Sequence, residues 1–138
     1  MKKILFSAVI FANLLSAQDK RQVLFTNKNQ NTVACYRIPS IVKSHDNTLV
    51  AVIDERHNSC ADLIGNTNIN IAMRSSSDGG KTWSDTKTVI DLPEGQSASD
   101  PSMVLDRKTK EIFMFYNYMD HKIPGKEFRL HVDQKSVV

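Results

Sequence analysis

After residue 18 the chain alternates short apolar segments with polar turns, and signals for α-helices are nearly absent. Between residues 68 and 75, for example, Ile69, Ile71 and Met73 alternate with polar or small residues, which gives one apolar and one mostly polar face. This pattern is typical of antiparallel sheets, so we predict an all-β domain. The predicted strands are residues 36–43, 48–56, 68–75, 86–92, 102–106 and 111–119, and a further strand begins near residue 128.

A sequence repeat relates the first predicted strand pair to the last. The sequence PSIV at residues 39–42 resembles PSMV at residues 101–104, and LVAV at residues 49–52 corresponds to IFMF at residues 112–115. Two matches in the same order, each in a strand–turn–strand unit, indicate repeated four-stranded sheets arranged radially, as in a β-propeller. A sandwich of Greek-key type is the alternative that the pattern leaves open.

Residues 76–83 (SSDGGKTW) stand between two predicted strands and have the pattern of a self-contained hairpin turn. Asp78 can accept hydrogen bonds from nearby backbone N–H groups, the adjacent glycines permit positive φ, and Trp83 can pack over the turn. We expect this segment to have a structural role and not to contact a substrate.

The first 17 residues have the pattern of an export signal. Lys2 and Lys3 provide positive charge, residues 4–15 form an apolar segment, and Ser16-Ala17 is a small-residue cleavage site. Because the apolar segment is too short to span a bilayer, we predict no membrane span in the mature chain. The prediction is a signal peptide at residues 1–17 and a protein that is periplasmic, on the cell surface or secreted; an anchor helix or a buried strand is the alternative.

Composition narrows the possible functions further. The formal net charge is +3, and the basic residues are scattered rather than grouped with aromatic residues, which argues against nucleic-acid binding. The four histidines show no ligand spacing, so no metal or other cofactor is predicted. Cys35 and Cys60 are compatible with one disulfide in an exported protein, but two unpaired buried thiols fit equally well.

Two motifs in the same order resemble those of the bacterial exo-α-sialidases. Residues 76–83 fit S-x-D-x-G-x-T-W, the Asp box of these enzymes, and residues 36–39 (YRIP) resemble the F/Y-R-I-P motif that begins their first blade. With Asp62 and residues 99–102 (SDPS), the similarity covers roughly residues 36–120. It implies a six-bladed β-propeller, of which residues 18–138 form only the first one to two blades. On this expectation the domain is truncated at its C-terminus, and its open strand edges favour aggregation or disorder.

The resemblance implies a retaining hydrolase that removes terminal sialic acids from glycoproteins, glycolipids or oligosaccharides. Sialic acid carries a carboxylate on its anomeric carbon, and a planar guanidinium can pair with both carboxylate oxygens. By its match to the motif, Arg37 is one of three arginines that bind this carboxylate, and Asp62 is the acid/base that protonates the leaving oxygen. From local sequence alone, an exposed arginine at a strand start is an equally good interpretation of Arg37, and an ordinary turn-capping aspartate is the better interpretation of Asp62.

Arg56 and Asp100 are implied as further substrate-binding residues at the pocket edge. A strand-end ion pair and a turn before proline are their alternative interpretations. The nucleophile of the family is a tyrosine with a glutamate base, which avoids the repulsion that a carboxylate would meet beside the substrate carboxylate. The resemblance places that pair and the other two arginines in later blades, so we assign no such role to Tyr116, Tyr118 or Glu111.

A second class of function stays open at this point. In a non-catalytic sialoglycan-binding or remnant propeller module, the contacts to the carboxylate survive and turnover does not. The two cysteines bear on both classes, because Cys35 and Cys60 each lie two residues before a candidate site residue, Arg37 and Asp62. A shared pocket would therefore bring the cysteines close to one another.

Overall fold

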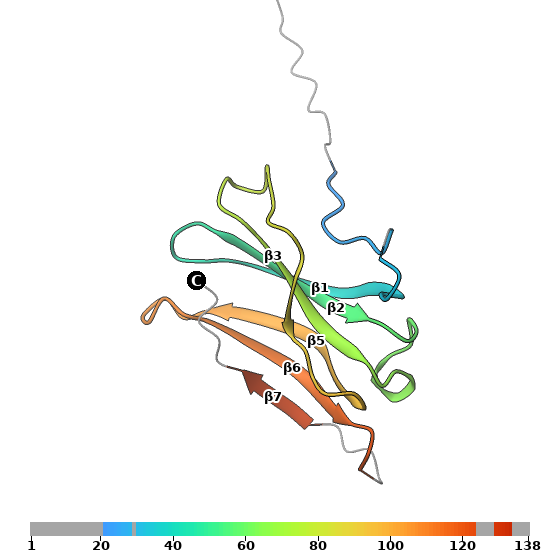
Figure 1. The fold of residues 1–138 in the computed structure, drawn as a ribbon. Helices are drawn as coiled ribbons and strands as arrows, with labels where there is room; N and C mark the ends of the chain where they lie inside the picture. The colour runs from blue at the N-terminus through green and yellow to red at the C-terminus, as the bar shows by residue number, and fades with distance from the viewer. Residues whose placement is uncertain (1–20, 29, 124–128, 134–138) are drawn as a thin grey trace, which may run out of the picture.

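The computed structural model describes residues 21–28, 30–123 and 129–133, and within these ranges it contains two antiparallel β-sheets (Figure 1). The first sheet has the strand order β1-β2-β3-β4 and the second has the order β5-β6-β7. The elements are β1 (Cys35–Lys43), β2 (Leu49–Arg56), the 3-10 helix η1 (Leu63–Gly65), β3 (Ile69–Ser76), β4 (Lys87–Ile90), β5 (Gln96–Leu105), β6 (Ile112–Asp120) and β7 (Arg129–Asp133). The predicted signal peptide lies outside the described residues, and no helix within them is long and apolar enough to cross a membrane.

The strands agree with the predicted ones to within one or two residues, except at the start of β5. This strand begins at Gln96, whereas the apolar pattern predicted residue 102. Its first half contains Ser97, Ala98 and Ser99, all of which are buried. Small side chains are required there because the first sheet packs closely against them, and small polar residues give no hydrophobic pattern from which a strand could be predicted.

The predicted repeat corresponds to two hairpins of the same construction, β1-β2 and β5-β6. In both, the strand register shifts at the same place in the repeat, between Arg37 and Ser40 and again between Ser99 and Ser102. Each shift contains a residue with positive φ, 55° at Ile38 and 58° at Asp100. Such angles are uncommon outside glycine and are costly for a β-branched residue, so they identify a bend that both hairpins maintain.

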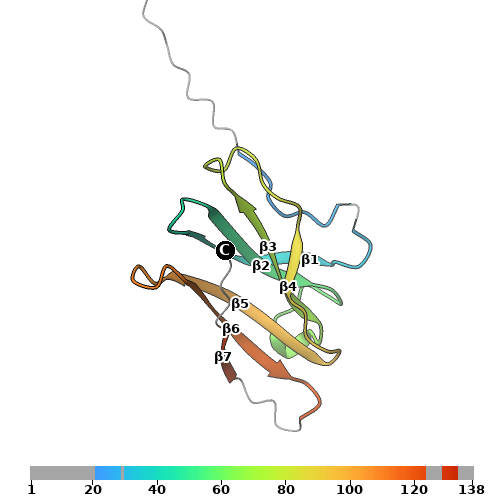
Figure 2. The same ribbon diagram turned by 60° about the vertical axis from the view of Figure 1, so that its left-hand side comes forward.

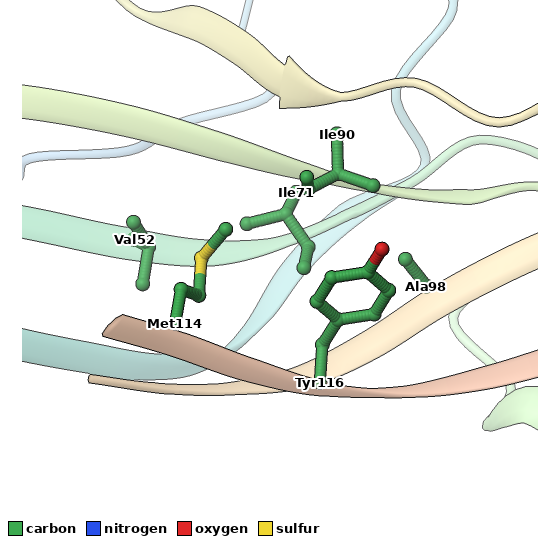
Figure 3. Close-up of a cluster of buried hydrophobic side chains, with 6 residues drawn as sticks. All are labelled: Val52, Ile71, Ile90, Ala98, Met114 and Tyr116. Carbon is green, nitrogen blue, oxygen red and sulfur yellow. The ribbon is translucent and has the colours of Figure 1, made fainter. Parts of the chain in front are cut away.

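The hydrophobic core lies between the two sheets, which face one another in both ribbon views (Figures 1 and 2). It consists of Val52, Ile71 and Ile90 from the first sheet and Ala98, Met114 and Tyr116 from the second (Figure 3). Full burial of each large side chain contributes about 1.5–3 kcal/mol. This packing fixes the first sheet relative to the second, so residues at the adjoining strand ends have defined relative positions.

The predicted turn at residues 76–83 is organised around the carboxylate of Asp78. This group accepts hydrogen bonds from the backbone N–H of Lys81 (2.9 Å), from the hydroxyl of Ser76 (2.8 Å), and from both the N–H (2.9 Å) and the hydroxyl (2.6 Å) of Thr82. Trp83 Nε1 donates to the carbonyl of Gly80 (3.2 Å), which folds the indole back over the turn. The turn is therefore stabilised by its own residues, as the sequence predicted.

Candidate functional site

The loop between β2 and β3 carries Asp62 and is attached covalently to the start of β1. Cys35 and Cys60 form a disulfide with their Cα atoms 5.7 Å apart, which decides between the alternatives that the sequence left open. Immediately after Asp62, η1 begins with Leu63, whose side chain is buried. The disulfide on one side and the buried leucine on the other hold Asp62 over the end of the first sheet.

Arg37 and Asp62 lie together at this end of the sheet. Arg37 Nη1 is 3.2 Å from Asp62 Oδ1 and also donates to the carbonyl of Cys60 (3.1 Å). Both side chains are accessible, with exposed fractions of 44% and 75%. They border a cleft of about 380 Å³ that reaches across to the second sheet; its lining residues are Arg37, Ile38, Asp62, Leu63, Ile64, Gly65, Ser99 and Asp100. Three of the four predicted site residues therefore share one cleft.

Arg56, the fourth predicted site residue, is completely buried behind Asp62 and is not among the residues that line the cleft. Its Nη1 donates to Asp62 Oδ1 (2.8 Å), and its Nη2 donates to Asp54 Oδ2 (2.8 Å). Burial lowers the pKa of Arg56, but the hydrogen bonds and charges of these two carboxylates outweigh that effect and raise it. The prediction of Arg56 at the pocket edge was thus close in position, but its guanidinium contacts the acid and not the open cleft.

Asp100 lies on the opposite side of the cleft, in β5, where the backbone bends. Its N–H donates to Asp54 Oδ1 (2.8 Å), and its own Oδ2 accepts from Asn117 Nδ2 (2.8 Å). The carboxylate is therefore oriented by the neighbouring strand while it borders the cleft.

Asp54 is the site residue that sequence reasoning missed. Its side chain has no exposed surface, yet it accepts hydrogen bonds from Arg56, from the hydroxyl of Ser99 (2.7 Å) and from the N–H of Asp100. Burial raises the pKa of Asp54, and these hydrogen bonds oppose the rise. The available signal was its place in β2. Asp54 lies two residues after Val52 and therefore on the same face of the strand, which packs against the second sheet. A buried charge there is costly unless it is paired.

The electrostatics of Asp62 favour its ionised form in this state. The hydrogen bond and charge of Arg56, with a further contribution from the charge of Arg37, lower the pKa of Asp62. A general acid needs the opposite shift, toward a higher pKa. In this structure the Asp62 carboxylate accepts a hydrogen bond from Nη1 of Arg37 as well as from Nη1 of Arg56.

A tyrosine–glutamate pair is present on the other face of the first sheet. Tyr36 Oη donates to Glu55 Oε1 (3.2 Å), and burial together with the charge of Glu55 raises the pKa of Tyr36 to about 12. Side chains alternate along a strand, so Tyr36 points away from the side occupied by its neighbour Arg37. Its position and its raised pKa both argue against a nucleophilic role. Tyr116, to which the sequence assigned no catalytic role, lies in β6 and packs in the core between the sheets.

Known proteins resemble this chain in sequence and in fold. No family model matches the chain. It is 35% identical to a sialidase of Bacteroides fragilis (strain YCH46) over 88 residues, covering 59% of this chain and 16% of the relative. It is 37% identical to a sialidase of Micromonospora viridifaciens over 89 residues, covering 60% of this chain and 13% of the relative.

The structure of a leech intramolecular trans-sialidase in complex with 2,7-anhydro-Neu5Ac superposes on it with a TM-score of 0.64 at 26% identity, covering 75% of this chain and 18% of that one. The chain is thus similar in sequence to sialidases over about 60% of its length. Its two sheets superpose on part of the β-propeller of solved sialidase structures, which confirms the predicted fold class. It spans 13–16% of the length of the two curated sialidases described above.

Within the described residues, no group of three or more histidine, cysteine, aspartate or glutamate side chains could hold a metal ion.

Proposed function

We propose that the cleft binds a terminal sialic acid and that the protein is an exo-α-sialidase, which hydrolyses terminal sialic acids of glycoconjugates with retention. The contact between Arg37 and Asp62, 3.2 Å from Nη1 to Oδ1, carries the proposal. In a sialoside the carboxylate and the glycosidic oxygen are attached to the same carbon. The cation that binds the carboxylate and the group that protonates the glycosidic oxygen must therefore lie close together, as Arg37 and Asp62 do.

Binding of the substrate would itself adjust the proton affinity of Asp62. When the substrate carboxylate pairs with Arg37, that guanidinium no longer stabilises the Asp62 carboxylate. The negative charge of the substrate and the loss of water from the cleft both favour the protonated acid. The pKa of Asp62, which Arg56 lowers most in the empty site, would then rise, and the acid would be better able to donate a proton to the leaving oxygen.

The remaining residues of the cleft would orient the sugar. The Asp100 carboxylate, held by Asn117, can accept hydrogen bonds from sugar hydroxyls. Retention also requires a nucleophile at the anomeric carbon, on the face opposite the leaving group. Among the described residues that line the cleft, none is a tyrosine or a glutamate. Turnover would depend on such a pair from outside this set.

A sialoglycan-binding module without turnover is the second candidate. The observation that favours it is the lowered pKa of Asp62, which keeps the group ionised and able to accept but not to donate a proton. Both candidates share the contact between Arg37 and the carboxylate of the ligand. They differ only in whether the bond to the aglycone is broken.

Hydrolysis and binding assays distinguish these candidates. Release of a fluorescent aglycone from an α-sialoside, abolished by Asp62→Asn, supports the sialidase. Saturable binding of sialic acid without release, weakened by Arg37→Ala, supports the binding module. Glucuronic acid is a useful control ligand because it is a carboxylated sugar of different shape. Absence of both release and binding would reject the proposed site.

Export is part of the same proposal. Residues 1–17 would form a cleaved signal peptide, which would give access to sialylated glycoproteins, glycolipids or oligosaccharides outside the cytoplasm. The Cys35–Cys60 disulfide supports this location, because structural disulfides persist mainly in oxidising compartments. The geometry around Asp78 supports assignment of residues 76–83 as an Asp box. N-terminal sequencing of protein recovered from culture medium or periplasm should find Gln18 as the first residue; an N-terminus that retains Met1 would reject cleavage.

A further inference from the structure

We propose that Asp54 is a positioning residue of the cleft, whose buried carboxylate holds both the Arg56 guanidinium behind the acid and the backbone of Asp100 across from it. The inference rests on the proposed function, because it assigns Asp54 a part in binding sialic acid. Asp54 itself does not line the cleft. It would act entirely through the residues that it contacts, which are Arg56, Ser99 and Asp100.

On the first sheet, Asp54 determines the direction of the Arg56 side chain. Arg56 presents Nε (3.2 Å) and Nη2 (2.8 Å) to a single oxygen of Asp54, so one edge of the planar guanidinium is fixed. The other edge then presents Nη1 to Asp62 Oδ1 at 2.8 Å. Because the guanidinium is rigid, fixing one edge fixes the other. The position of Asp62 in the cleft therefore depends on a carboxylate that does not touch it.

On the second sheet, the same carboxylate stabilises the bend that presents Asp100. Ser99 Oγ donates to Asp54 Oδ2 (2.7 Å), and the Asp100 N–H donates to Asp54 Oδ1 (2.8 Å). Asp100 has a φ of 58°, a conformation that non-glycine residues maintain only when surrounding contacts require it. Asp54 supplies such a contact from the other sheet. It thus joins the two sides of the cleft.

An aspartate is required at this position because every neighbour is a donor. The Arg56 guanidinium and the backbone N–H of Asp100 can only donate, and a carboxylate offers acceptors on both oxygens. Asp54→Asn has nearly the same shape but replaces one acceptor oxygen by an NH₂ group, which must face donors from Arg56 and Ser99 or from Asp100. The variant therefore removes the positioning function while it leaves the packing volume almost unchanged.

The test compares Asp54→Asn with two control variants in the full chain. Asp46→Asn removes a carboxylate whose partners, Ser44 and Thr48, belong to the turn between β1 and β2, at the opposite end of β2 from Arg56. Ile90→Val removes one methylene from the core and serves as the control for a general loss of stability. NMR would measure hydrogen exchange of the Arg56 Nε–H and of the Asp100 amide, and a titration with sialic acid would give the dissociation constant.

We expect both exchange rates to rise in Asp54→Asn and binding of sialic acid to weaken by about tenfold, as for loss of a hydrogen bond to a charged group. Both controls should leave exchange and binding at wild-type values. Unchanged exchange and binding in folded Asp54→Asn would overturn the inference, as would weakening of the same size in Ile90→Val. Faster exchange in Asp54→Asn, in a protein whose wild type binds no sialic acid, would support the positioning and reject the ligand.

Should Asp54→Asn fail to fold, the wild-type protein still provides a test. The Arg56 Nε–H donates to a buried carboxylate, whereas the Arg37 side chain is 44% exposed. The inference requires the Arg56 Nε–H to exchange much more slowly than that of Arg37. Equal exchange rates for the two groups would overturn it.

Discussion

Removal of the Cys35–Cys60 disulfide should destabilise the protein and release the loop that carries Asp62. The bond joins residues 25 apart in the sequence, and closing a loop of that length in the unfolded chain corresponds to about 3.5 kcal/mol in the chain-entropy treatment. Domains of this size have total stabilities of about 5–15 kcal/mol, so the loss is a large fraction of the whole. Without the bond, the loop keeps the hydrogen bonds that Arg56 donates to the carbonyls of Cys60 and Ala61, which contribute about 1 kcal/mol each.

Urea unfolding followed by circular dichroism would measure this loss. The free energy of unfolding should be lower by about 3 kcal/mol in both the Cys35→Ser/Cys60→Ser variant and the reduced wild-type chain than in the oxidised chain. Agreement between the two would exclude an effect of the reductant. Free energies rather than midpoints should be compared, because the slope changes when the unfolded chain expands. The amide of Gly65, which donates to the Asp62 carbonyl (2.8 Å), should exchange faster. A loss below about 0.5 kcal/mol with unchanged exchange at Gly65 would refute the view that the bond holds this loop.

Three further perturbations test other parts of the structure. Arg37→Lys should weaken sialic-acid binding by about tenfold in a calorimetric titration, because an ammonium cannot pair with both carboxylate oxygens, while Arg107→Lys in a remote turn should have no effect. Hydrogen bonds lower the pKa of Asp78 in the folded state. The contribution of Asp78 to stability is therefore complete above the ordinary aspartate pKa and is lost as the pH falls toward the folded-state pKa. Asp78→Asn should remove this dependence and flatten the acid side of a plot of melting temperature against pH. Ile71→Ala should cost about 2–5 kcal/mol by chemical denaturation, and a loss under 1 kcal/mol would contradict its place in the core.

Most of the fold could be predicted from the sequence because regular alternation of apolar residues reports strands directly. The first half of β5 could not, since Ser97 and Ala98 are buried by the close approach of the first sheet and not by their own hydrophobicity. Arg37 was found through a motif and not through periodicity, and its distance from Asp62 depends on a loop whose path no local pattern specifies. Asp54 was missed because its place in β2 indicates only that its charge needs partners, whereas two of its donors, Ser99 and Asp100, come from the other sheet.

At the bends around Ile38 and Asp100 the backbone conformation is nearly the same, although the side chains differ. Both positions have nearly the same φ and border the same cleft, yet one carries a hydrocarbon and the other an acid. A duplicated hairpin can therefore keep its pairing intact while exchange of a single side chain alters the chemistry presented at each corner. Substitutions at Ile38 and Asp100 would therefore change the chemistry of the cleft while the fold stays the same.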